Sequence, residues 1–122
     1  MKESLNNIEE EVKGGTIMIK VKLVVRVVRD NETVGGYVKD VELPFVPIIG
    51  MKFKQGISTT LWETGDNNEL SPVVKHLIYD FDEECIVALF EVSEFLSSNF
   101  WTKLDYENLG DRCAEMNYFD CV

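Results

Sequence analysis

The chain has few of the residues on which catalysis and metal binding usually depend. Its 122 residues include one histidine, His76, and three cysteines without close spacing. A nucleophilic site needs serine or cysteine beside a histidine and an orienting acid, and a zinc site needs more imidazole or thiolate ligands than these. His76 falls within a predicted strand, which favours a structural role. We therefore expect a protein that is not an enzyme and that has no metal or cofactor site.

Long apolar runs are also absent. No segment approaches the ~18 apolar residues that a membrane-spanning helix needs, and the acidic, polar N-terminus does not resemble a signal peptide. An odd number of cysteines is typical of reduced thiols rather than of a disulfide framework. These features predict a cytoplasmic location. The sequence leaves open whether Cys113 and Cys121 pair.

Basic residues are scarce in the last third of the chain. Residues 80–122 hold eleven acidic residues and only two basic ones, Lys103 and Arg112, and they carry most of the net charge of −10. Nucleic-acid binding requires clustered lysine and arginine, and an anionic membrane surface would repel this chain. We therefore expect no nucleic-acid or membrane binding, and attraction to a basic protein instead.

Residues 1–17 differ in character from the rest. They are mostly polar, with glutamate at positions 9–11, and the apolar pattern of a core begins only at Ile17. The stretch from Lys13 to Met18 can also be encoded by codons that contain a bacterial ribosome-binding site. Two interpretations stay open: a helical N-terminal extension, or residues outside the native protein, with translation starting at Met18. Residues 18–122 are predicted to form a single α+β domain.

Alternation of apolar and polar residues predicts a hairpin at the start of this domain. Residues 17–28 place isoleucine, valine and leucine on one face at period two, with Lys20, Lys22 and Arg26 on the other. Asp30-Asn31 and Gly35-Gly36 bracket a turn, so residues 37–43 form the return strand. This alternation predicts a sheet with one face in water.

Prolines interrupt the pattern after this hairpin. Pro44 and Pro47 predict a loop or sheet edge, with the apolar residues around Pro47 folding back onto the core. Gly50 permits a turn into a short strand over residues 51–54. Residues 55–72 are predicted to be a loop, with a short strand at 59–62.

The second half is predicted to combine a hairpin with short helices. Strands are expected over residues 73–79 and 85–92, joined by an acidic turn at 80–84. Ser93 is a plausible cap for a helix that continues to Leu104, and Asp111 for a final helix through Tyr118, with Gly110 as the break. Strands followed by helices indicate an α+β fold. We expect an antiparallel, curled sheet or small barrel of about five strands with short C-terminal helices.

The acidic last third also contains most of the aromatic residues, and this combination suits a protein interface. Aromatic anchors supply affinity, and an acidic surround speeds encounter with a basic partner. The alternative is an ordinary solvated surface over a core that buries the aromatic rings. The candidate partner-binding residues are Asp80, Asp82, Glu83, Glu84, Trp101, Asp105, Tyr106, Glu107, Asp111 and Tyr118.

Small size, strong acidity, cytosolic thiols and the lack of catalytic motifs together resemble bacterial immunity proteins. The resemblance is one of type and has no motif. It implies a protein that binds a cognate cationic toxin, such as a nuclease, and neutralises it by electrostatic occlusion of its active site, as in contact-dependent inhibition. The alternative is a non-catalytic structural or accessory module that acts through self-association as a homo-oligomer. In one form of this alternative, a phage is the source of the gene for such a module.

Overall fold

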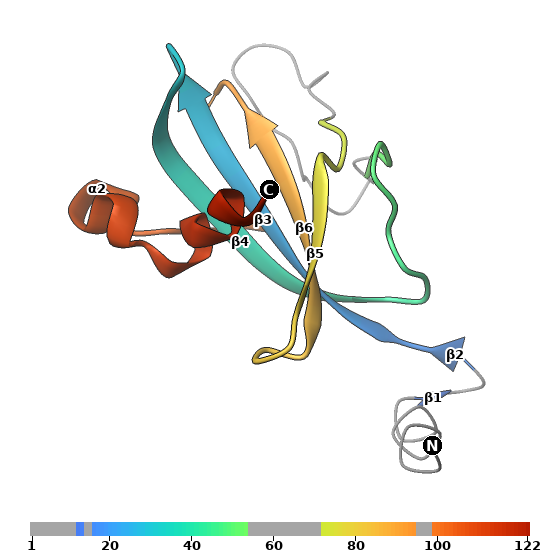
Figure 1. Cartoon of the computed structure of the whole chain (residues 1–122). Coiled ribbons are helices and arrows are strands. Elements are labelled where there is room, and N and C mark those ends of the chain that lie inside the picture. The colour runs from blue at the N-terminus through green and yellow to red at the C-terminus, as the bar shows by residue number, and fades with distance from the viewer. Residues whose placement is uncertain (1–11, 14–15, 54–71, 95–98) are drawn as a thin grey trace.

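The computed structural model describes residues 12–13, 16–53, 72–94 and 99–122, which form two sheets and a short helical C-terminal segment (Figure 1). A small sheet pairs β1 (Val12–Lys13) with β2 (Thr16–Ile17). Residues 1–11, and with them most of the N-terminal extension, lie outside the described residues. So does the strand predicted at 59–62.

A long hairpin forms the middle of the main sheet. β3 (Ile19–Arg29) pairs with β4 (Glu32–Leu43) in antiparallel register from Ile19↔Leu43 to Arg29↔Glu32. Asp30 and Asn31, with φ of 53° and 66°, form the two-residue turn, because this turn needs left-handed backbone at both positions. The predicted return strand therefore begins five residues too late. Gly35 and Gly36 do not bracket the turn but pair with β3 inside β4.

The remaining strands extend the main sheet on both sides. β5 (His76–Asp80) and β6 (Cys85–Val92) form the predicted hairpin, and β7 (Thr102–Lys103) pairs with β4. The strand order is β5-β6-β3-β4-β7, and β3 pairs with β6 in parallel. The sheet is therefore mixed rather than antiparallel, and open rather than a barrel. The physical reason is that β6 inserts beside β3, after a long connection from β4.

Both faces of the main sheet carry packed apolar residues, which corrects the prediction of one wet face. The apolar odd-numbered residues of β3, from Ile19 to Val27, belong to one cluster together with Val74, Phe90 and Trp101. Val24, in the middle of the other face, packs with Leu89 and with residues of the C-terminal segment. Lysines on one face of a strand therefore do not keep the whole face in water, because the C-terminal segment covers the valine that follows them on that face.

The loop after β4 also differs from its prediction. Pro47 is buried, whereas Phe45, Val46, Ile48 and Ile49 are exposed rather than folded back onto the core. Gly50 makes the predicted turn with a φ of 91°. Instead of a strand at 51–54, a single bridge joins Lys52 to Val73.

The C-terminal segment is α2 (Tyr106–Leu109), then the 3-10 helices η1 (Gly110–Arg112) and η2 (Ala114–Cys121). The predicted helix ending at Leu104 is wrong over residues 99–104, where β7 lies; residues 95–98 are outside the described part. Asp111 does not cap η2, which follows Cys113. In Figure 1, η2 lies over the sheet face near β3. Gly36 makes room for this cover, since a Cβ there would lie 2.6 Å from Met116 Cε.

Candidate functional site

The turn between β5 and β6 gathers four of the candidate residues at one end of the sheet (Figure 1). Asp80 ends β5, and Asp82, Glu83 and Glu84 are exposed. Asp80 Oδ1 accepts the backbone N–H groups of Asp82 and Glu83, at 2.9 and 3.1 Å. Aspartate favours turns because its side chain can bind the backbone that follows it. We call residues 80–84 the acidic turn.

The acidic turn is tied to the C-terminal segment. The Tyr118 hydroxyl donates a hydrogen bond to Asp80 Oδ2 at 2.5 Å. This bond, together with the backbone N–H groups and the charge of Lys22, holds the pKa of Asp80 below its ordinary value. Burial and the neighbouring carboxylate raise the pKa of Tyr118. Asp80 is therefore an anion and Tyr118 a neutral donor at pH 7.

An exposed aromatic pair lies in the same place. Phe81, in the acidic turn, is 85% exposed, and Tyr79, at the end of β5, is 51% exposed. Their rings meet edge to face, with centroids 4.9 Å apart. Phe81 therefore presents a large apolar surface to solvent from a defined position, with carboxylates on either side of it in the chain.

A hollow of about 430 Å³ separates the acidic turn from η2. Carboxylates of Asp82, Glu83 and Glu115 line it beside Asp80. Among the described residues in its lining, Lys22 carries the only positive charge. The surface between the turn and η2 thus has an excess of negative charge.

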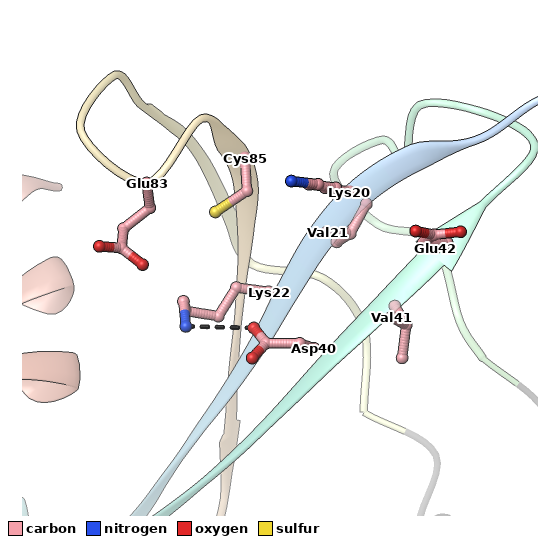
Figure 2. Close-up of a pocket in the computed structure, with 8 residues that line it drawn as sticks. All are labelled: Lys20, Val21, Lys22, Asp40, Val41, Glu42, Glu83 and Cys85. Atoms are coloured by element: carbon pink, nitrogen blue, oxygen red, sulfur yellow. Dashed lines mark ion pairs between the residues drawn. The ribbon is translucent and has the colours of Figure 1, made fainter. Parts of the chain in front are cut away.

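Lys22 also lines a neighbouring hollow of about 400 Å³, shown in Figure 2. Its Nζ lies 3.1 Å from Asp40 Oδ1. Burial lowers the pKa of Lys22, but the hydrogen bond and charge of Asp40, with a contribution from Glu83, outweigh burial and raise it. In Figure 2 the Glu83 carboxylate lies on the same side as Lys22. Because Lys22 is bound to Asp40, it offsets only part of the charge of the acidic turn.

The other candidate acids lie at the opposite edge of the sheet. Asp105, Glu107 and Asp111 belong to the segment of α2 and η1 beside β4, whereas the acidic turn follows β5. Their side chains bond locally: Asn108 Nδ2 to Asp105 at 2.8 Å, Lys103 Nζ to Glu107 at 3.1 Å, and the Tyr106 hydroxyl to Asp111 at 3.4 Å. The candidate residues therefore form two groups rather than one continuous surface.

Trp101 belongs to neither group. It is 7% exposed and is part of the core cluster on the far side from η2, with Phe100 against it at 5.2 Å between ring centroids. A ring with so little exposed surface cannot anchor a partner without unfolding its surroundings. We therefore leave Trp101 out of the candidate surface.

The prediction missed Phe81, Tyr79, Lys22 and Glu115 as members of the site. The position of Phe81 between two aspartates in the five-residue acidic turn is a sequence feature that indicates its exposure. No pattern in the sequence places Glu115 or Lys22 beside the acidic turn, because both reach it through tertiary packing. The three cysteines are free, with Cys85 and Cys113 buried and Cys121 exposed.

Within the described ranges, no group of three or more histidine, cysteine or acidic side chains is arranged to hold a metal ion. No helix in that part of the chain is long and apolar enough to cross a membrane. No family model, curated protein or solved structure matches this chain.

Proposed function

We propose that the protein is an inhibitor of the immunity type, which binds a basic protein toxin through the acidic turn and blocks its active site. The observation that carries the proposal is Phe81: a phenylalanine 85% exposed among four carboxylates. Burying such a ring against a partner gains about 2 kcal/mol or more of hydrophobic free energy. The cytoplasm, where a delivered toxin would act, is the proposed location.

The electrostatics of the acidic turn suit a cationic partner. Asp80 is held ionised by its hydrogen bonds, and Lys22 is the only cation among the described residues that line the hollow beside η2. A basic toxin that binds nucleic acid must itself carry clustered positive charge. Carboxylates placed against that cluster would attract the toxin over a Debye length and would fill its substrate site.

The backbone of the turn offers a further argument. Glu84 has a φ of 54°, a left-handed conformation that glycine or asparagine adopts at lower cost. A glutamate at such a position raises the energy of the folded chain, and strained residues cluster at functional sites. An acid kept at this cost supports a role for its charge.

The test starts from the gene beside the one that encodes this chain, which the proposal expects to encode a large toxin. Calorimetric titration of the purified chain with the purified toxin domain should show binding that weakens as salt is raised. The variant Asp82→Asn, Glu83→Gln, Glu84→Gln should associate with the toxin domain more slowly, and its affinity should fall less steeply as salt is raised.

The matched control removes the same number of carboxylates at the other edge: Asp105→Asn, Glu107→Gln, Asp111→Asn. The proposal expects this control to keep most of the affinity. If the control variant loses binding and the acidic-turn variant keeps it, the site belongs at α2 and η1 and our assignment is wrong. A toxin that binds both variants as tightly as the wild type rules out electrostatic occlusion.

The alternative role, an accessory module that acts by self-association, is favoured by a different feature, the outer edge of β5. A phage morphogenesis cluster around the gene, with no toxin gene, would support that role over the proposed one.

A further inference from the structure

β5 is the outermost strand of the main sheet on its side. The chain before it is paired, since Gly50 N donates to Val74 O at 2.8 Å and Val74 N to Met51 O at 2.9 Å. From His76 to Asp80, among the described residues, β6 is the only strand that pairs with β5. Figure 1 shows β5 at the margin of the sheet. One row of its backbone donors and acceptors therefore points away from the sheet.

The two edges of the sheet differ in how they are protected. Proteins usually protect an edge with very short strands, lysine, proline or bulges, because an open edge pairs with other strands. β7, the opposite edge, is two residues long and contains Lys103. β5 has five residues, without lysine or proline, and Leu77, Ile78 and Tyr79 in its centre. β5 therefore keeps the length and composition of a strand that pairs.

We propose that β5 pairs antiparallel with β5 of a second copy of this chain, about a two-fold axis at Ile78. The sequence of β5 is complementary to itself in this register. His76 of each copy faces Asp80 of the other, Leu77 faces Tyr79, and Ile78 faces Ile78. Cross-strand pairs of imidazole with carboxylate and of aliphatic with aromatic side chains both stabilise antiparallel strands. A two-fold contact of this kind closes on itself and joins the two sheets into one.

The faces of the sheet agree with this register. Leu77 packs with the cluster that contains Phe90, and Ile78 with the cluster on the η2 side. Residues directly opposite each other in a ladder share a face, so the half-exposed Tyr79 would lie over Leu77 of the second copy. The exposed surface of Tyr79 would then be covered in the dimer, and Phe81 would remain outside the ladder.

The dimer is expected to be weak and to respond to salt in a distinctive way. Pairing of five residues covers less area than the ~800 Å² per partner of a standard interface. Each copy has a net charge of −10, so the copies repel each other at low salt. Raising the salt should strengthen this dimer, whereas it should weaken the contact with a basic toxin. The two proposals therefore fail independently.

Sedimentation equilibrium of the full chain at several concentrations is the first test. We expect a monomer–dimer equilibrium that shifts toward dimer as salt is raised. His76→Glu places like charges opposite each other twice, and should raise the dimer dissociation constant roughly tenfold or more. His76→Gln adds no negative charge opposite Asp80 and serves as the matched control, with a dissociation constant within about threefold of the wild type. A monomer at all concentrations, or equal effects of the two variants, overturns the proposal.

The register has its own test. In a Cys121→Ser background, Ile78→Cys places two thiols opposite each other at the two-fold axis, within the separation that a disulfide needs. Oxidised glutathione should convert this variant to a covalent dimer much faster than a Tyr79→Cys variant, whose position faces Leu77. Equal rates, or faster crosslinking at position 79, exclude the register. Thermal unfolding of both variants checks that the fold is kept.

Discussion

The hydroxyl of Tyr118 and the carboxylate of Asp80 join two parts of the chain that lie 38 residues apart. Tyr118 is in η2, near the C-terminus, and Asp80 is where β5 enters the acidic turn. The bond fixes η2 against that end of the sheet. The shape of the candidate surface therefore depends on a contact that does not use the exposed side chains of Asp82, Glu83 and Glu84.

Tyr118→Phe should make the stability of the fold less dependent on acid pH. The hydrogen bond from Tyr118 is the largest cause that lowers the pKa of Asp80. A carboxyl with a depressed folded pKa stabilises the fold above its unfolded pKa, about 3.9, and loses this contribution as the pH falls toward the folded pKa. Urea unfolding at pH 7 and pH 3 should show a smaller difference for the variant than for the wild type. An unchanged difference would mean that the bond does not form in solution.

Phe119 should stabilise the C-terminal segment through both packing and charge. It is 7% exposed, and the Arg26 guanidinium lies 4.3 Å from the centroid of its ring. Phe119→Ala should lower the free energy of unfolding by about 3 kcal/mol. Phe119→Leu keeps most of the apolar volume and should cost less, with the contact to the cation, worth about 0.5–1 kcal/mol, as part of the remaining loss. Chemical unfolding measures both variants. Equal losses in the free energy of unfolding would show that the apolar volume of Phe119 does not contribute separately from its contact with Arg26.

Gly36→Ala should destabilise the protein through Met116. The added Cβ would lie 2.6 Å from Met116 Cε and 3.1 Å from Leu104 Cδ1. Overpacking of this kind costs about 1–3 kcal/mol. Met116→Ala removes the obstructing atoms, so the cost of Gly36→Ala should fall in that background. A double-mutant cycle measures this coupling, and additive losses would show that the contact is not the cause.

Glu84→Gly should make the fold more stable while it weakens partner binding. Glycine relieves the left-handed backbone at φ 54°, which is worth up to about 1 kcal/mol. The same substitution removes one carboxylate from the acidic turn. Thermal unfolding should shift upward and the association rate with the toxin domain should fall. A variant that is less stable than the wild type would show that the Glu84 side chain contributes more to folding than its backbone costs.

The three cysteines should differ in their reactivity toward Ellman's reagent. Cys121 is exposed, whereas Cys85 and Cys113 are buried, and burial raises the pKa of both buried thiols. Thiolate is the reactive form, so about one thiol per chain should react quickly and two slowly. Cys121→Ser should abolish the fast phase. Two fast thiols in the wild type would mean that η2 separates from the sheet readily.

Local pattern determined the parts of the fold that depend on neighbours in sequence. The alternation of β3 and the apolar run of β6 identify these strands, and the bounds of β6 agree with those expected. The sequence predicts the acidic turn because aspartates follow one apolar strand and precede another. These features depend on side-chain period and turn chemistry, which act over a few residues.

Contacts distant in sequence decided what the local pattern did not show. Leu96, Phe100 and Leu104 repeat at a helical spacing, but residues 102–103 pair with β4, because a sheet edge was available there. The parallel pairing of β3 with β6 has no local sign either, since it depends on the path of the intervening chain.

The candidate site shows the same division. The carboxylates of the acidic turn and Phe81 lie together because they are neighbours in the sequence. Three features depend on tertiary packing alone: the acidic turn lies beside η2, Lys22 lies between two hollows, and Trp101 is buried in the core. Charge is a property of composition, but a charged surface exists only where the folded chain brings exposed groups together, and burial and distance are set by the whole structure.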